Sequence, residues 1–277
     1  MVSAINAVVS LLLLLSCLMN TASSAAKKVA LSRVRAISFD VTGTVLVHRH
    51  PIFETYADAA VWANLKDPPS AIELKPAFKA AYKETLLQDP CFGGTTGGER
   101  TWWVKCVKNA LARTGRTYTD NEFNIYFRRI YQHYGSLDGY EKLPDAVPFL
   151  NFVRSKKYLC GVCTNSPART LETVLPMLAL HEFFNFFVCS QDVNAEKPAA
   201  AIFEATYEAA KYWMPDLKKE EVLHIGDSMP ADFCGARQFG FQSLLLDRSN
   251  NPRVTVYQVR PYLTATSPLL IPFLFPI

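Results

Sequence analysis

The sequence predicts an α/β fold, a doubly wound parallel sheet with a helical domain inserted into it. Two observations lead to this prediction. Short apolar runs rich in β-branched and aromatic residues alternate with helix-length segments, and the stretch 47–143 shows helical patterns without a strong strand signal. The composition agrees, because 49% hydrophobic residues over a length of 277 supply a sizeable core and disfavour a disordered or fibrous chain.

Five runs have the composition of buried strands: Val34 to Phe39, Tyr158 to Thr164, Phe183 to Ser190, Val222 to Gly226 and Phe241 to Asp247. Helices are expected between the later runs, over Pro167 to Leu178, Pro198 to Tyr212 and Pro230 to Gly240. Proline is tolerated in the first turn of a helix, and glycine suits the position after its end. Alternating strands and helices predict βαβ units and a parallel sheet.

The stretch 47–143 interrupts this alternation. Four helices are expected in it, over Phe53 to Leu65, Ala71 to Leu87, Glu99 to Arg113 and Thr119 to Tyr134. Four successive helices predict a small bundle inserted after the first strand. We therefore expect an α/β core formed by 27–46 and 144–248 and a helical cap formed by 47–143.

Both ends of the chain differ in composition from the rest. Residues 1–26 carry no charged side chain, and the apolar run Ala7 to Met19 is shorter than the ~20 residues that span a bilayer. Small residues follow this run, as at a signal-peptide cleavage site. We expect a leader to the secretory pathway or an organelle; an uncleaved anchor and a mistaken start codon, which would leave a cytoplasmic protein, are the alternatives. Prolines make a long helix improbable in the tail, 249–277.

Several conspicuous residues of the cap region receive conservative interpretations. The segment Gly93 to Gly98 resembles a phosphate-binding loop, but no Gly-Lys-Ser/Thr follows it, so we interpret it as a flexible hinge, with a substrate-facing loop as the alternative. Trp102 and Trp103 are interpreted as packing within and at the edge of the cap core. His48 and His50 are interpreted as solvated loop positions, which could also approach a substrate.

Charge excludes some partners. Lys and Arg number 29 against 25 Asp and Glu, and a net charge of +4 is too small to predict a nucleic-acid partner. The sequence has no set of apolar spans that would form a membrane bundle. We expect a small-molecule ligand, and the sequence does not fix the oligomeric state.

Reactive side chains follow the ends of the predicted strands. Asp40 follows the first strand, Thr164 ends the second, Lys197 lies after the third, and Asp227 follows the fourth, with Asp232 five residues later. Each of them alone has an ordinary structural explanation as a turn, cap or loop residue. Because ligands of doubly wound sheets bind at the carboxyl ends of the strands, we expect these side chains to lie together.

The three carboxylates fit phosphoryl transfer through a covalent intermediate. A carboxylate such as Asp40 can attack phosphorus and divide one difficult hydrolysis into two easier steps. Mg²⁺ prefers hard oxygen ligands, so Asp40, Asp227 and Asp232 with a backbone carbonyl could hold it.

Other residues at the same strand ends are candidate phosphate ligands. The Thr164 hydroxyl, the Asn165 amide and the Lys197 ammonium can bind phosphoryl oxygens, on which charge is spread in the transition state. Gly43 leaves room for backbone to approach the phosphate.

The order and spacing of these residues resemble the haloacid dehalogenase (HAD) superfamily over roughly Val34 to Asp247, with the helical insertion in the place of that family's cap. The resemblance implies a Rossmann-like core, a Mg²⁺ cofactor and a small phosphorylated substrate. It implies Asp40 as nucleophile and metal ligand, the Thr42 carbonyl as another ligand, and Asp227 as a metal carboxylate with Asp232 nearby. Within the superfamily, the segments 90–93, 102–103, 223–229 and 244–248 are similar to one group of proteins known in plants and animals.

Thr42 departs from the pattern of this family. Its phosphatases usually place a second aspartate two residues after the nucleophile, as general acid for the leaving group and base for water. A threonine hydroxyl cannot carry that proton at neutral pH, and general acid–base catalysis is worth ~10²–10⁴-fold. P-type ATPases, which form a comparatively long-lived aspartyl phosphate, have Asp-Lys-Thr-Gly-Thr, similar to residues 40–44 here.

We therefore expect a Mg²⁺-dependent phosphatase that is slow or specialised in its leaving group. Two alternatives stay open: a catalytically degenerate member that acts as a binding or interaction protein, and a haloacid dehalogenase.

Overall fold

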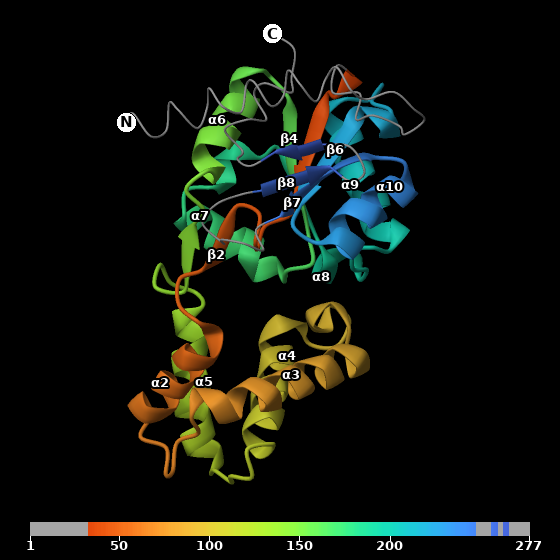
Figure 1. Ribbon diagram of the computed structural model, residues 1–277. Coiled ribbons are helices and arrows are strands. Elements are labelled where there is room, and N and C mark those ends of the chain that lie inside the picture. The colour runs from red at the N-terminus through yellow and green to blue at the C-terminus, as the bar shows by residue number, and fades with distance from the viewer. Residues whose placement is uncertain (1–32, 248–255, 260–262, 266–277) are drawn as a thin grey trace, which may run out of the picture.

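The core of the structure is a sheet built on the alternating strands that the sequence predicts (Figure 1). The computed structural model describes residues 33–247, 256–259 and 263–265, so the expected leader lies outside the described residues, as does most of the tail. Within the described ranges, no helix combines the length and apolar character needed to cross a membrane.

Five parallel strands carry the site. β1 (Ala36–Phe39) lies in the middle, flanked by β4 (Leu159–Thr164) and β6 (Val222–Gly226), with β5 (Phe186–Cys189) beyond β4 and β7 (Gln242–Asp247) beyond β6. The chain crosses to β4 on one side of β1 and later to β6 on the other, which places a topological switch point at the carboxyl end of β1. The doubly wound α/β core that the sequence predicts is confirmed.

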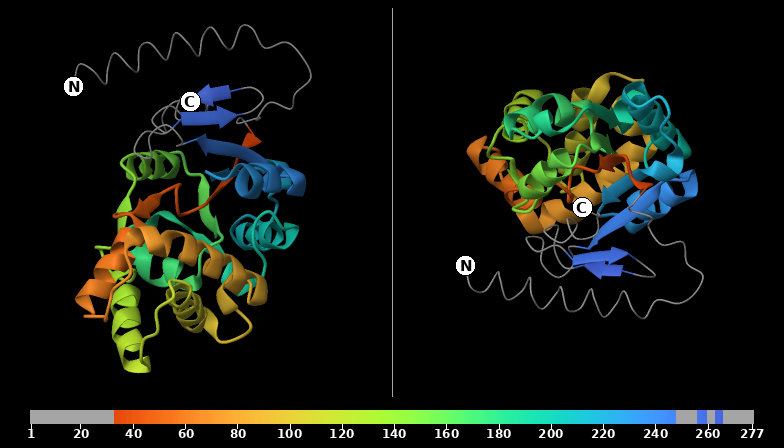
Figure 2. Two further views of the ribbon diagram at one scale, coloured as in Figure 1. Left: turned by 60° about the horizontal axis from the view of Figure 1, so that its bottom comes forward. Right: turned by 90° about the horizontal axis from the view of Figure 1, so that it is seen from above.

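The far edge of the sheet differs from the prediction. β8 (Val256–Val259) pairs antiparallel with β7, and β9 (Leu263–Ala265) pairs antiparallel with β8, at the edge away from the cap (Figure 2). The sheet is therefore mixed rather than wholly parallel, and part of the expected proline-rich tail belongs to it. Antiparallel neighbours need only a short connection, so this extension requires no crossover helix and leaves no helical signal in the sequence.

Helices cover both faces of the sheet. On one face α6 (Ala146–Ser155) and α7 (Leu175–Met177) join a hydrophobic cluster with β1, and on the other α9 (Ala200–Trp213) and α10 (Gly235–Phe239) join a second cluster. α6 is not among the helices that the sequence predicts. Shorter helical segments complete the connections: π-helices at Thr170–Val174 and Met229–Cys234, 3₁₀ turns at His181–Phe183 and Lys219–Glu221, and α8 (Ser190–Val193).

The cap consists of four helices that agree with the four expected segments: α2 (Ile52–Trp62), α3 (Ala71–Gln88), α4 (Gly98–Ala112) and α5 (Asp120–His133). Capping boxes begin two of them, where Ser70 and Thr119 each pair with a glutamate three residues later. The cap has a hydrophobic cluster of its own, with Trp102 and Tyr126 fully buried in it.

A two-stranded antiparallel ribbon joins cap and core. β2 (Leu46–His48) leaves the core soon after β1, and β3 (Tyr140–Lys142) returns to it alongside. Each strand has only three residues, too few for a periodic signal, so the sequence did not indicate them. The ribbon lies between the cap helices and the core (Figure 1).

Candidate active site

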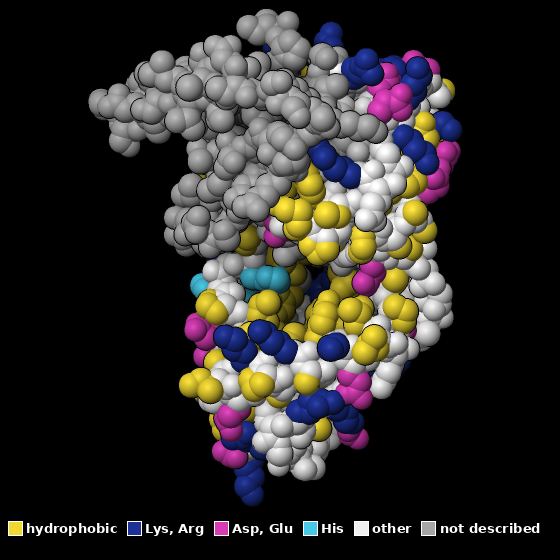
Figure 3. Space-filling model, turned by 45° about the vertical axis from the view of Figure 1, so that its right-hand side comes forward, with side chains coloured by type: hydrophobic (Ala, Val, Ile, Leu, Met, Phe, Trp, Pro, Cys, Tyr) yellow, Lys and Arg dark blue, Asp and Glu magenta, His cyan; other side chains and the backbone are white. Residues whose placement is uncertain are grey.

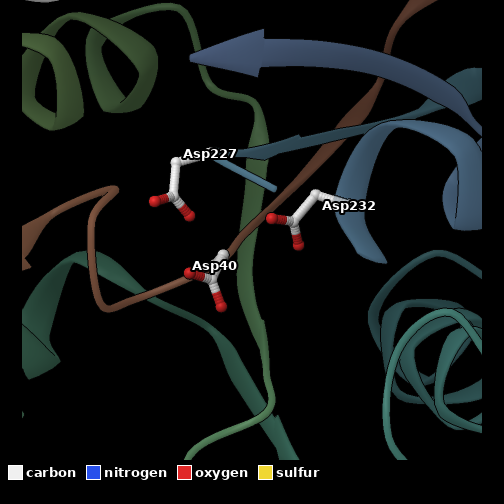
Figure 4. A group of neighbouring side chains, drawn as sticks. All are labelled: Asp40, Asp227 and Asp232. Carbon is white, nitrogen blue, oxygen red and sulfur yellow. The ribbon is translucent and has the colours of Figure 1, made fainter. Parts of the chain in front are cut away.

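Three aspartates meet at the carboxyl ends of β1 and β6. Asp40 follows β1, Asp227 follows β6, and Asp232 lies on the π-helix after it; their carboxyl groups face a common space (Figure 4). One carboxylate oxygen of each lies within 4.8 Å of the others. Because β1 and β6 are adjacent parallel strands, their ends bring the first two aspartates together whatever the loops between them do.

Lys197 lies between two of these carboxylates. Its Nζ donates hydrogen bonds to Oδ1 of Asp40 at 2.8 Å, to Oδ1 of Asp232 at 2.6 Å and to the backbone carbonyl of Cys163 at 2.8 Å. Burial by itself would lower the pKa of Lys197, but the two carboxylates outweigh it and hold that pKa above its usual value. All three donors of the ammonium are therefore used, and it stays charged.

Asn165 holds this lysine in place. Its Oδ1 accepts from the backbone N–H of Lys197 at 2.7 Å, and its Nδ2 donates to the Lys197 carbonyl at 3.0 Å. Thr164 is buried at the end of β4 and donates its hydroxyl to Oγ of Ser166 at 3.1 Å. The Asn165 amide thus orients the lysine backbone, and Ser166, which the sequence analysis did not single out, joins the loop.

Asp232 is more fully hydrogen-bonded than its two neighbours. Besides Lys197, it accepts from the backbone N–H of Ser228 at 2.8 Å, and its Oδ1 lies 3.0 Å from Nε2 of the buried His224. Burial would raise the pKa of Asp232, but the Lys197 charge and the His224 hydrogen bond hold it well below its usual range. Asp232 is therefore an anion whose oxygens are occupied by protein donors.

His224 supports Asp232 from the neighbouring strand β6. Burial lowers the pKa of His224, so the ring is neutral near pH 7. Its Nδ1 lies 2.9 Å from the hydroxyl of Ser38, and the network is satisfied if Ser38 donates to Nδ1 and Nε2–H donates to Asp232. The available signal was a histidine within an apolar strand, which must have a buried polar partner.

Asp227 lies at the solvent-facing edge of the group. Partial removal from water, followed by the negative charges of Asp40 and Asp232, raises the pKa of Asp227 to about 6. Two closely spaced anions at one strand edge are a fitting oxygen donor set for a divalent cation, which would offset their repulsion. The donor set fits Mg²⁺ held by Asp40 and Asp227, with Asp232 orienting Lys197 beside them.

Two glycines make room for these carboxylates. A Cβ added to Gly226 would overlap the Asp232 carboxyl, and one added to Gly43 would overlap the Asp227 carboxylate. Gly43 also has φ +86°, a backbone conformation that other residues rarely adopt. Both positions therefore require glycine.

A cavity of about 380 Å³ lies between the cap and the loops of the core. Figure 3 shows a hollow there with hydrophobic side chains around it. Thr42, Asn165 and Ser166 line it on the core side. Trp103 packs at the edge of the cap core, as the sequence predicts, and also lines the cavity. His48 lies on β2 and lines the cavity, so it is not in a solvated loop and fits the alternative interpretation of that residue. Their positions depend on how the cap folds over the core, which local sequence does not show.

The glycine-rich segment of the cap contacts the core. Gly94 lies so close to the backbone carbonyl of Gln191 on α8 that a Cβ there would overlap it. The Thr96 hydroxyl donates to the Asp89 carboxylate, which also pairs with Lys105 at 3.0 Å. The segment that the sequence interprets as a hinge therefore contacts the core through Gly94.

Comparison with known proteins identifies the class to which this fold and site belong. A family model for haloacid dehalogenase-like hydrolases matches residues 34–240, and the chain belongs to that family. One relative is the Rhythmically expressed gene 2 protein of Drosophila melanogaster, which is 30% identical over 78% of this chain and 84% of that protein. Another is the human haloacid dehalogenase-like hydrolase domain-containing protein 3, which is 28% identical over 77% of this chain and 82% of that protein. Similarity to the protein 3 group, which the segments in and beyond the cap predicted, is confirmed.

Solved structures share the fold. The HAD-hydrolase YfnB of Bacillus subtilis, in a structure bound to magnesium, superposes with a TM-score of 0.59 at 19% identity, covering 78% of this chain and 90% of that one. The L-2-haloacid dehalogenase of Xanthobacter autotrophicus gives 0.55 at 17% identity, covering 78% of each chain. At these identities the likeness establishes the fold alone.

Proposed function

We propose that this protein is a Mg²⁺-dependent phosphatase that hydrolyses a small phosphomonoester through an aspartyl phosphate on Asp40. The observation that carries the proposal is the grouping of Asp40 with Asp227 around an accessible space, while Lys197 supplies a fixed positive charge from the buried side. Membership of a hydrolase family supports it at the coarser level.

The residues of the chain divide the work between them. Asp40 offers a carboxylate oxygen to phosphorus, and the Lys197 ammonium donates a hydrogen bond to Asp40 Oδ1 and stabilises negative charge on the phosphoryl oxygens. Asp40, Asp227 and the Thr42 carbonyl would hold Mg²⁺, which when bound neutralises the phosphoryl charge. His224 and Ser228 fix Asp232, and Asp232 in turn fixes the lysine.

A direct assay tests this function. Residues 27–277 are incubated with a panel of phosphomonoesters with Mg²⁺ and with EDTA, and released phosphate is measured. We expect release that requires Mg²⁺ and falls to background in Asp40→Asn, because an amide is a poor nucleophile and a weaker metal ligand. Release no greater than that of Asp40→Asn for every ester would contradict a phosphatase.

The main alternative is a degenerate binding protein, and it rests on one observation, the absence of an acidic side chain at Thr42. Formation of a beryllofluoride–Mg²⁺ complex at Asp40, without hydrolysis of any ester, would favour it. A haloacid dehalogenase would not need Asp227, and release of chloride from a 2-chloro acid without metal would favour that activity instead.

Substitution of Gly43 tests the placement of Asp227. Gly43→Ala should lower the free energy of unfolding by roughly 1–2 kcal/mol, the cost of a side chain at positive φ. It should also raise the Mg²⁺ concentration needed for half-maximal activity, because the added Cβ displaces the Asp227 carboxylate. Gly115→Ala is the matched control, since Gly115 has φ +78° with nothing within 4 Å of the added Cβ. Equal Mg²⁺ dependence in the two variants would mean that Asp227 does not hold the metal.

A further inference from the structure

The cavity beside the site has an aromatic lining on its cap side. Its volume of about 380 Å³ lies within the ~300–1,000 Å³ typical of small-molecule sites. The rings come from the cap and from the ribbon that carries it: Tyr56, Tyr82, Phe92, Trp103, Tyr131 and Tyr140. Rings of this kind favour stacking and edge contacts with another ring.

The backbone around Phe92 favours a built lining rather than an incidental one. Cys91 and Phe92 both have positive φ, at 53° and 55°, which costs free energy in residues other than glycine. The same turn continues into Gly94, which rests on the core. The cap–core contact therefore holds a strained turn that brings the Phe92 ring to the cavity, the kind of strain found at ligand sites.

One acidic side chain in this lining has an unused hydrogen-bonding atom. Oε1 of Glu99 accepts from the Tyr131 hydroxyl at 2.6 Å, while Oε2 is buried and has no hydrogen-bond partner among the described residues. The nearby Arg169 makes no hydrogen bond to this oxygen: its guanidinium stacks on the Tyr131 ring at 3.7 Å, one of its N–H groups donates to the Tyr131 carbonyl, and its positive charge acts on Glu99 from a distance. Burial raises the pKa of Glu99, as expected for a carboxyl group short of hydrogen bonds. A buried acceptor without a donor is costly, and a ligand can provide the donor.

The chemistry of the reaction restricts the leaving group independently. Thr42 is exposed at the core side of the cavity and cannot protonate a departing oxygen at neutral pH. An aliphatic alkoxide leaves poorly without that proton. A phenolate leaves readily, because a phenol has a pKa of about 10. The residue at position 42 and the aromatic cavity thus favour the same class of ester.

We propose that the substrate, given the phosphatase function on which this inference rests, is an aryl phosphate whose ring occupies the cap cavity and whose amine or hydroxyl group donates to Glu99. Asp40 Oδ attacks phosphorus, the phosphorus–oxygen bond to the ring breaks, and its electron pair leaves with the phenolate, which takes a proton from solvent. Water then attacks the phosphorus of the aspartyl phosphate, releasing inorganic phosphate and restoring the Asp40 carboxylate. The sum is hydrolysis of one ester by one water.

Four phosphate esters test each part of the proposal. 4-Ethylphenyl phosphate and 2-phenylethyl phosphate are isomers that differ in whether an aryl or an alkyl oxygen leaves, and tyramine phosphate adds an ammonium group to the first. Glucose 6-phosphate is the polar comparison. We expect kcat/KM to fall in the order tyramine, 4-ethylphenyl, 2-phenylethyl and glucose ester.

Glu99→Gln should reduce the preference for tyramine phosphate over 4-ethylphenyl phosphate by about tenfold, the effect of one charge-assisted hydrogen bond. Glu182→Gln, which removes the charge of an exposed glutamate outside the cavity, should leave it unchanged. Faster hydrolysis of the glucose or phenylethyl ester than of the 4-ethylphenyl ester, or a tyramine preference that survives Glu99→Gln, would overturn the proposal while leaving the phosphatase function intact.

Binding separates this inference from the proposed function. If no ester is hydrolysed, saturation-transfer NMR with free tyramine, 4-ethylphenol and glucose tests whether the cavity binds a phenol ring. Tyramine binding that is weakened in Glu99→Gln would support the aromatic site on a protein without turnover. No binding of either phenol would overturn it.

Discussion

Replacing Thr42 by aspartate is expected to raise the turnover of 2-phenylethyl phosphate by about 10²-fold or more, within the ~10²–10⁴-fold that general acid–base catalysis supplies. The side chain at position 42 is exposed, borders the cavity and lies two residues after Asp40, so an aspartate there can reach both the leaving oxygen and the attacking water without repacking the core. The gain on 4-ethylphenyl phosphate should be smaller, because a phenolate departs without protonation and only the step in which water attacks improves.

Thr42→Asn is the control for this prediction. Asparagine has the shape of aspartate but neither donates nor accepts a proton at neutral pH, so its turnover should stay near that of the natural protein. The aspartate variant should also gain an ionisation in its pH–rate profile that the asparagine variant lacks. Turnover of Thr42→Asp no faster than that of Thr42→Asn would show that the rate is not limited by proton transfer at this position.

The sequence was most informative where chemistry and topology coincide. Asp40, Lys197 and Asp227 can be grouped from the order of residues alone because each follows an apolar strand, and parallel strands bring their carboxyl ends to one edge of a sheet. The rule depends on position along the chain and not on side-chain packing. For the same reason, it placed Asp232 near the site without indicating which donors would surround it.

Residues whose roles depend on a distant partner were not predictable in this way. His224 gains its role from Ser38 on the adjacent strand and from Asp232, and Glu99 reaches the cavity only because the cap folds over the core. The ribbon that carries the cap is also set by tertiary pairing, since three residues per strand leave no periodic signal. The features that the sequence missed therefore share a dependence on tertiary contacts.

Lys197→Met is expected to abolish phosphate release and to lower the free energy of unfolding at pH 7 by about 3–5 kcal/mol, the usual cost of removing one partner from a buried ion pair. Methionine is close to lysine in length, so the loss is of charge and hydrogen bonds rather than of volume. It leaves Asp40 and Asp232 close together without their shared cation and the Cys163 carbonyl without its donor. Lys108→Met is the control: Lys108 pairs with Asp120 on the cap surface, where both side chains are exposed, and should change stability by no more than about 0.5 kcal/mol.

The pH dependence of the stability difference between Lys197→Met and the natural protein identifies what destabilises the variant. In the natural protein the pKa of Asp232 is depressed, so its contribution to stability is present above the unfolded value of about 3.9 and is lost as pH falls through the folded value. Without Lys197, the buried Asp232 carboxyl has lost its principal counter-charge, so its pKa in the folded variant rises. Acid then protonates this carboxyl and relieves its repulsion with Asp40. The stability difference between Lys197→Met and the natural protein, measured by urea unfolding in EDTA, should therefore narrow from pH 7 toward pH 4. A difference that stays constant over that range would mean that lost packing, and not the unpaired carboxylates, destabilises the variant.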